Sequence, residues 1–226
     1  MTARAMSPAV VTVWSDISCP WACLAVHRLW TARERLGLVD QVTFDHRVFA
    51  LEVVNEKPTP RLVNDAEIPV IGGLAPDAGW QVWSADAWTF PVTVLPAMEA
   101  VQAAKAESLE ASARLDRALR NALFGESRCI SLRHVIVDVA KQCGVDSTAI
   151  AAALDEGTSR GAVMAQHREA IDGPVRGSPH LFLPDGTDVH NPGITMHWAG
   201  PKRGGFPVVD HDDPTVYDDL LQRAAN

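Results

Sequence analysis

Long hydrophobic runs are missing from this 226-residue sequence. No apolar stretch approaches the roughly 18 residues that a bilayer span needs, because Pro, Gly and charged residues interrupt every candidate. A secretory signal would continue from a basic start into about 7–15 apolar residues, whereas MTARAMSPAV leads directly into a short strand-like segment. These two absences predict a cytoplasmic protein.

Basic residues are also scarce. The chain has 20 Lys and Arg residues against 28 Asp and Glu residues, which gives a formal net charge of −8. Nucleic-acid-binding proteins carry a basic stripe or patch that attracts phosphates, and anionic membrane surfaces attract the same kind of patch. We therefore expect neither a nucleic acid nor a membrane among the partners of this protein.

Cysteine is the third scarce residue, with four in the chain. The cysteine and histidine spacings do not match the paired C-x₂-C pattern of zinc sites. A chain of this length buries about 70% of its unfolded-state surface, so it needs no metal or disulfide to fold. The sequence therefore predicts no metal and no tightly bound cofactor. In a reducing compartment, the thiols are expected to be reactive or simply buried.

The N-terminal quarter of the chain alternates between strand and helix patterns. Ala9–Trp14 is a β-branched run, and Val42–Leu51 alternates between apolar and polar residues. Between them, apolar residues at helical spacing run from Pro20 to Gly37. Pro20 suits the first position of a helix, because the N–H that proline lacks would have no partner there. This order predicts a βαβ unit.

The middle of the chain is expected to be loop-rich and then helical. Residues 52–91 hold many Pro and Gly residues and show no sustained period, which predicts loops. Ser131 and Asp146 are expected helix N-caps in the part that follows. Residues 96–173 have helical patterns, with helices expected at Ala97–Ala113, Leu115–Phe124, Ser131–Cys143 and Asp146–Leu154.

Strand patterns return near the C-terminus. His180–Leu183 and Thr187–His190 flank a Pro-Asp-Gly turn and predict a hairpin. A Gly- and Pro-rich loop follows, with a small basic patch at Lys202 and Arg203, and Thr215–Ala224 predicts a final helix. The order βαβ, helices, ββα predicts an α/β fold that an all-helical insertion interrupts.

Cys19 is the first candidate for chemistry, because it lies between the first strand and the helix that starts at Pro20. Free backbone N–H groups and the helix dipole favour a thiolate at this position, and they can lower a cysteine pKa from about 8.5 into the range of roughly 3.5–7.5. The alternative is a small buried residue that fills the corner between strand and helix.

The residues around Cys19 resemble a known active site. Asp16-Ile17-Ser18-Cys19-Pro20-Trp21 is similar to the D-x-x-C-P-W-C start of DsbA-like thioredoxin-fold proteins, and in particular of the FrnE-like branch. Gly177-Ser178-Pro179-His180, followed by a short strand, is similar to the Gly-x-Pro segment of that family, whose cis-proline faces the cysteine.

This resemblance implies a fold and a set of site residues. It implies one DsbA-like domain over residues 1–226, with thioredoxin-like parts at 8–52 and 174–226 and a helical insertion at 53–173. Cys19 would be the nucleophile. The residues that the resemblance implies bind substrate are Ser178 and Pro179, and Pro20 next to Cys19 is a further candidate. Trp21 either lines the mouth of the pocket or faces the core. His180 either contacts substrate or is simply exposed at the start of an edge strand.

One position departs from the family pattern. Ala22 stands where the second redox cysteine would be, so the C-x-x-C disulfide cannot form. Cys23 follows one residue later, and is either a buried helix residue or a displaced resolving thiol. Asp16 is either a cap of the turn before the helix or a group that tunes the Cys19 thiol.

Three functions remain open from the sequence. The first is thiol-disulfide exchange through Cys19, with a low-molecular-weight thiol such as glutathione or mycothiol as co-substrate. The second is addition of a bound thiol to an electrophile, because the pattern also resembles kappa-class glutathione transferases and 2-hydroxychromene-2-carboxylate isomerases, which have Ser at the Cys19 position. The third is a redox-inactive binding or chaperone-like module. Base rates alone favour a homodimer.

Overall fold

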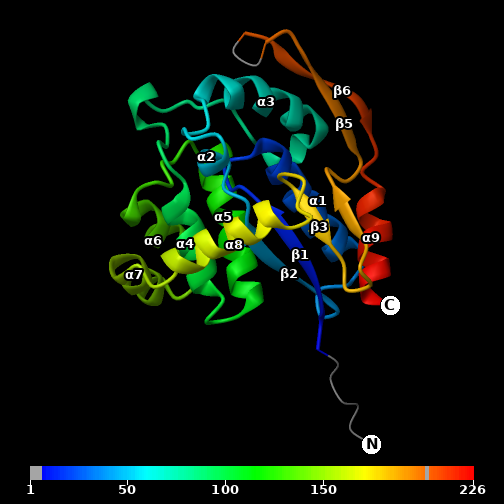
Figure 1. Ribbon diagram of the computed structural model, residues 1–226, viewed down its shortest axis with the longest axis horizontal. Coiled ribbons are helices and arrows are strands. Elements are labelled where there is room, and N and C mark those ends of the chain that lie inside the picture. The colour runs from blue at the N-terminus through cyan, green and yellow to red at the C-terminus, as the bar shows by residue number, and fades with distance from the viewer. Residues whose placement is uncertain (1–6, 202–203) are drawn as a thin grey trace, which may run out of the picture.

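A four-stranded sheet lies at the centre of the computed structural model, which describes residues 7–201 and 204–226 (Figure 1). The strand order is β2-β1-β3-β4. β1 (Ala9–Ser15) pairs in parallel with β2 (Val42–Val48) and antiparallel with β3 (His180–Phe182). β4 (Asp188–His190) pairs antiparallel with β3. The two ends of the chain therefore build one sheet, as the α/β prediction required.

Helix α1 (Pro20–Arg35) joins two hydrophobic cores. Ala25 and Leu29 pack with the sheet and with the C-terminal helix α9 (Val216–Ala225). Cys23 and Leu24 pack with the helices that follow β2. Because α1 has buried residues on both sides, a shift of this helix would disturb both cores, and its first turn is held firmly in place.

Helices fill the chain between β2 and β3. Their bounds are α2 (Leu51–Val54), α3 (Arg61–Leu74), α4 (Leu95–Ala104), α5 (Leu109–Phe124), α6 (Arg133–Gln142), α7 (Ser147–Glu156) and α8 (Arg160–Asp172), with short 3-10 turns at Pro76–Ala78 and Ala87–Thr89. Figure 1 shows α4, α6 and α7 to the left of the sheet, α8 crossing β1 in this view and α3 above them near β6 (Phe206–Asp212). None of the helices in the described ranges is long and apolar enough to cross a membrane.

Two segments expected to be loops are regular structure. Helix α3 forms within the Pro- and Gly-rich stretch, with Pro69 inside it, because Ile68 and Ile71 are buried in the core of the helical block. The C-terminal loop contains an antiparallel pair, β5 (Ile194–Ala199) and β6 (Phe206–Asp212). Tertiary packing overrides local composition in α3. Lys202 and Arg203 lie outside the described residues.

Helix boundaries also correct the predictions. The expected helix Ala97–Ala113 is two helices, because α5 starts only at Leu109, after Ser108 accepts a hydrogen bond from the Ala111 N–H at 3.0 Å. Asp146 caps α7 as predicted. Ser131 does not cap α6. Its hydroxyl instead donates to the Thr93 carbonyl.

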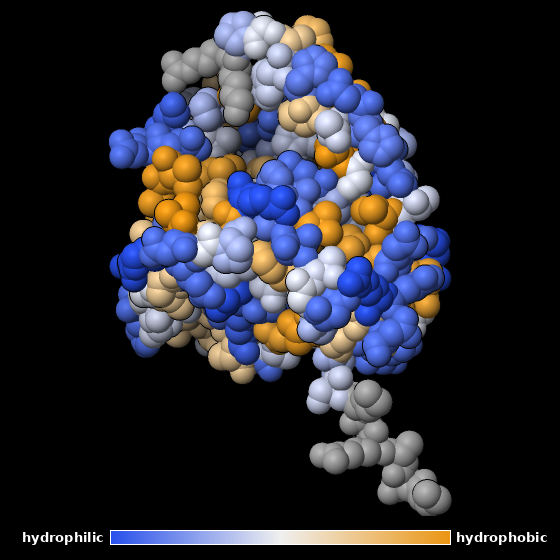
Figure 2. Space-filling model, turned by 45° about the vertical axis from the view of Figure 1, so that its right-hand side comes forward, coloured by the Kyte–Doolittle hydropathy of each residue, from blue (hydrophilic) through white to orange (hydrophobic). Residues whose placement is uncertain are grey.

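The space-filling view shows how the surface reflects the composition (Figure 2). Apolar residues on this face form separate patches between charged ones, and the acidic chain keeps most of its large apolar side chains inside. Singly exposed apolar side chains such as Trp88 and Leu62 are normal on protein surfaces.

Candidate functional site

Cys19 is the N-cap of α1, as the sequence predicted, and its side chain meets the loop before β3. The Cys19 thiol donates a hydrogen bond to the Ser178 carbonyl at 3.3 Å, across a sequence separation of 159 residues. The Ser178–Pro179 peptide bond is cis. The Ser178 hydroxyl accepts a hydrogen bond from the Asp16 N–H at 2.8 Å. The two motifs that carried the family resemblance therefore meet at one point.

The electrostatics of Cys19 contradict the sequence prediction. Burial raises the pKa of the Cys19 thiol to about 11, and the carboxylate of Glu67 adds to the rise. The Ala22 N–H at the helix start lowers the pKa, as expected, but by less. Cys19 is only 5% exposed. The prediction of a lowered Cys19 pKa was wrong. The position at the helix start has a smaller effect on this pKa than the desolvation of the thiolate by the surrounding protein.

A pocket of about 350 Å³ adjoins Cys19. The start of α1 forms one wall through Cys19, Pro20 and Trp21, and the α2–α3 segment forms the other. Pro20 and Trp21 therefore line the pocket, and their contact with a substrate stays a prediction. The remaining lining residues are Ser18, Leu51, Asn55, Lys57, Thr59, Pro60, Val63, Asn64 and Glu67.

The far wall of this pocket is polar, and its residues were missed by sequence analysis. The Trp21 indole N–H donates to Glu67 at 3.1 Å. Asn64 is 2% exposed, and neither its amide nitrogen nor its amide oxygen has a hydrogen-bond partner among the described residues. Asn55 and Lys57 are exposed at the rim. The Asn64-x-x-Glu67 spacing, next to Ile68 and Ile71, was the pattern that could have revealed a helix with a polar face.

Asp16 organises the loop before Cys19 rather than contacting the sulfur. One carboxylate oxygen accepts hydrogen bonds from the Ser18 N–H at 2.7 Å and the Ser18 hydroxyl at 2.6 Å. The other accepts from the Leu51 N–H at 2.7 Å. Burial raises the pKa of Asp16, against these hydrogen bonds. Of the two roles left open for Asp16, the capping role is the one that these contacts support.

His180 does not line the pocket. Its ring is fully buried in the sheet, and Nε2 lies 2.8 Å from Asp188 while Nδ1 accepts from the Arg176 N–H at 3.1 Å. The substrate-contact prediction for His180 is therefore wrong, because its position in β3 turns the side chain into the protein. Ser178 and Pro179 also lie outside the pocket lining, and Ser178 reaches the site through the Cys19 thiol.

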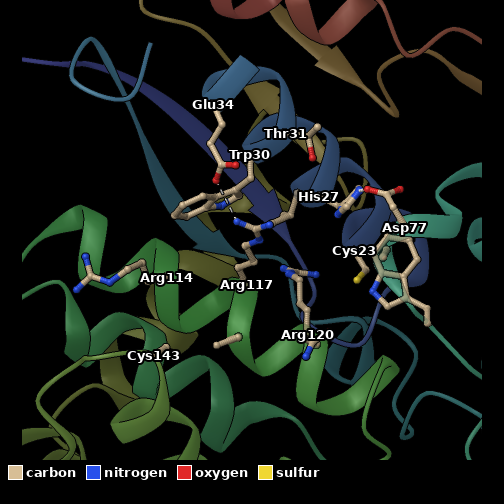
Figure 3. A pocket seen from close by; sticks show the side chains of 15 residues that line it. Cys23, His27, Trp30, Thr31, Glu34, Asp77, Arg114, Arg117, Arg120 and Cys143 are labelled. Carbon is tan, nitrogen blue, oxygen red and sulfur yellow. Dashed lines mark hydrogen bonds and ion pairs between the residues drawn. The ribbon is translucent and has the colours of Figure 1, made fainter. Parts of the chain in front are cut away.

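Cys23 lies one turn along α1 and faces a different cleft, of about 650 Å³, between α1 and α5 (Figure 3). Cys23 is 3% exposed, burial raises the pKa of its thiol, and both Cys19 and Cys23 are free cysteines. Since the two thiols line different cavities, Cys23 is not placed to resolve a disulfide formed in the Cys19 pocket.

A buried arginine from the helical block holds the loop before Cys19. Arg120 donates to the Asp16 carbonyl at 2.9 Å and to the Ser15 hydroxyl at 2.8 Å, and its Nε lies 2.8 Å from Asp116. Arg120 is 2% exposed. Sequence analysis missed this residue, because nothing local distinguishes it from the other arginines of α5.

Comparisons with known proteins agree with this geometry. Residues 82–200, more than half of the chain, match the family described as DSBA-like thioredoxin domain. No curated protein matches the sequence.

Solved structures give the same result for the fold. A probable DsbA oxidoreductase from Streptomyces coelicolor is 20% identical, with a TM-score of 0.69 over 96% of this chain and 89% of that one. A 2-hydroxychromene-2-carboxylate isomerase is 21% identical, with a TM-score of 0.59 over 80% and 87%. The cytosolic disulfide reductase DsbM from Pseudomonas aeruginosa, solved with GSH, is 18% identical, with a TM-score of 0.60 over 80% and 89%. With a matching family, a β2-β1-β3-β4 sheet and a cysteine facing a cis-proline loop, the chain belongs to the DSBA-like thioredoxin family.

Proposed function

We propose that this protein is a cytoplasmic thiol-disulfide oxidoreductase that uses Cys19 alone as its exchange thiol. The observation that carries the proposal is the pocket beside Cys19, whose lining contains no second cysteine. Ala22 removes the neighbouring thiol, and Cys23 lines the other cleft. A small thiol from solution must therefore complete each cycle.

The exchange needs two displacements. The Cys19 thiol gives its proton to solvent, and the thiolate attacks one sulfur of a small disulfide, which forms a mixed disulfide and releases a small thiolate. A second small thiolate then attacks the outer sulfur, so that a small disulfide leaves and the Cys19 thiolate takes up a proton. A thiol of high pKa is a strong nucleophile once ionised and a poor leaving group. The raised pKa of Cys19 thus favours a long-lived mixed disulfide.

The pocket wall fits a thiol with a peptide-like body. The Asn64 amide has an unused donor and an unused acceptor, which suits an amide of the substrate. Lys57 at the rim suits a carboxylate or hydroxyl group. Glutathione and mycothiol both present an amide close to their sulfur, and we propose this class of co-substrate.

Mass spectrometry after incubation with oxidised glutathione tests the exchange. We expect one glutathione adduct on Cys19 in the wild type and in Cys23→Ser, and none in Cys19→Ser. Cys23→Ser is the matched control, because Cys23 is equally buried on the same helix. An adduct on Cys23, Cys129 or Cys143 that persists in Cys19→Ser would contradict the proposal.

One contact favours a second candidate function. The Cys19 thiol is neutral and acts as a hydrogen-bond donor, and a serine hydroxyl could replace it in that role. A bound thiol could then be oriented by Cys19 and added to an electrophile, without redox change at Cys19. Turnover of glutathione with 1-chloro-2,4-dinitrobenzene separates the two functions. Retained activity in Cys19→Ser, with loss in Cys19→Ala, would favour the transferase or isomerase over the oxidoreductase.

A further inference from the structure

The larger of the two cavities shares no lining residue with the Cys19 pocket. It lies between α1 and α5, and the 3-10 turn at Pro76–Ala78 borders it (Figure 3). Its volume of about 650 Å³ is within the range of small-molecule sites, which is roughly 300–1,000 Å³. We call it the α1–α5 cleft.

Three arginines of α5 line this cleft at intervals of three residues: Arg114, Arg117 and Arg120. All three guanidinium nitrogens of Arg120 donate hydrogen bonds, to Asp116 and to the loop before Cys19. The other two are about 40% exposed, at 37% and 41% for Arg114 and Arg117. Figure 3 shows Arg117 and Arg120 rising from α5 toward α1, whereas the Arg114 side chain points away from Arg117.

Arg114 and Arg117 are loosely paired. Arg117 reaches Glu34 through one nitrogen at 3.4 Å, and Arg114 comes no closer than 3.7 Å to Glu107. Elsewhere in the protein, Arg33 holds Glu110 with two hydrogen bonds of 2.9 Å. Each guanidinium has five N–H donors, so most donors of Arg114 and Arg117 have no protein acceptor among the described residues.

The remaining lining groups add donors and aromatic surface. The indole N–H of Trp30, which is 6% exposed, has no partner among the described residues. The Arg117 guanidinium lies 4.9 Å from the Trp30 ring. Trp80 is half-buried, and its ring contacts His27 at 5.4 Å. Burial lowers the pKa of His27, which keeps the ring neutral at pH 7 even though Asp77 lies 3.4 Å away.

We propose that the α1–α5 cleft binds a small aromatic oxyanion. Its carboxylate or phosphate group would bind Arg117, and its ring would pack against the aromatic lining of the cleft. Charge-assisted hydrogen bonds from guanidinium groups to such oxygens are among the strongest in proteins. Glu34 competes with the ligand for Arg117, so the charge of Glu34 weakens binding. The site does not involve Cys19 and is independent of the proposed exchange reaction.

Titration of the ¹⁵N-labelled full chain with phenyl phosphate tests the proposal. Trp30→Phe and Trp80→Phe assign the two indole N–H signals of the cleft among those of the seven tryptophans. We expect saturable shifts of both signals in the wild type and in Cys19→Ser. Benzoate and inorganic phosphate, titrated separately, show which oxyanion is preferred and whether the ring contributes.

Charge variants sharpen the test. Arg117→Gln is expected to weaken phenyl phosphate binding about tenfold, the effect of losing one hydrogen bond to a charged group. Glu34→Gln is expected to tighten binding, which no loss of folding can mimic. Arg223→Gln removes the same charge from a residue paired with Asp185 outside the cleft, and should leave binding unchanged. Unmoved indole signals, or equal weakening by Arg117→Gln and Arg223→Gln, would overturn the proposal.

Discussion

Cys19 and Cys23 are one helical turn apart on α1, and they share most properties that are used to recognise reactive cysteines. Both are buried, both are free, and burial raises the pKa of both thiols. They differ in what they face. Cys19 contacts the Ser178 carbonyl and lines the pocket that holds the Asn64 amide, whereas Cys23 lines the α1–α5 cleft and packs in the core of the helical block.

This difference shows that the assignment of Cys19 depends on its surroundings and not on an intrinsically acidic thiol. A strongly nucleophilic thiolate at neutral pH is the usual criterion for a catalytic cysteine. Neither thiol meets it in this structure. What distinguishes Cys19 is its contact with the cis-proline loop at Ser178. Each prediction below tests one part of the difference between the two cysteines.

Ala22→Cys should have the largest effect, because it restores a second thiol beside Cys19. The backbone N–H of residue 22 is already close enough to Cys19 to lower its pKa. We expect an intramolecular disulfide with Cys19 under mild oxidation, whereas the wild type keeps four free thiols. Thiol titration and peptide mapping measure it. A Cys19–Cys23 disulfide in the oxidised wild type would erase the distinction between the two cysteines.

Arg120→Met should lower the free energy of unfolding by about 3–5 kcal/mol, because it leaves the buried Asp116 without its main partner. Denaturant unfolding measures the loss. The same variant removes the hydrogen bonds from Arg120 to Ser15 and Asp16, which hold the loop before Cys19. Alkylation of Cys19 should therefore accelerate more than alkylation of Cys23. Arg117→Met, at an exposed pair, is the matched control and should cost less than about 1 kcal/mol.

Asn64→Leu should separate stability from binding. Replacing a buried amide without partners by an apolar side chain of similar size should stabilise the fold by about 1 kcal/mol. The same change should raise the KM for a small thiol or disulfide while the Cys19 adduct still forms at high concentration. An unchanged KM would show that Asn64 does not contact the substrate.

Glu67→Gln should have the smallest effect, a lower pKa of Cys19. The negative charge of Glu67 is one cause of the raised pKa, and glutamine keeps an oxygen for the Trp21 indole. Wild-type alkylation at Cys19 should rise with pH up to about 11, and the variant should reach its plateau at a lower pH. Glu56→Gln, at an exposed position outside the pocket, should behave like the wild type.

Sequence reasoning recovered the parts of the fold that local patterns determine. The β-branched run at Ala9, the proline at the start of α1 and the Asp146 cap all led to elements that the structure contains. The pairing of Cys19 with Ser178 was anticipated only through the family resemblance, because no local pattern links residues so far apart.

The errors have a common physical cause. Helix α3 contains Pro69, Gly72 and Gly73, and it forms because Ile68 and Ile71 are buried by elements distant in the sequence. The pKa of Cys19 depends on desolvation by the same kind of distant packing. Composition and spacing describe neighbours along the chain, so they could not predict that the polar face of α3 lies opposite Cys19, or that His180 is buried.

The hydrogen bond between Cys19 and Ser178 also bears on how the chain is made. During synthesis on the ribosome, Cys19 emerges 159 residues before its partner. At about 5–20 residues per second, the nascent chain presents this thiol to the cell for on the order of 10 seconds or more before residue 178 is added. Throughout that interval the Cys19 thiol lacks the carbonyl to which it donates in the folded protein, so the contact that joins the two motifs is completed late in synthesis.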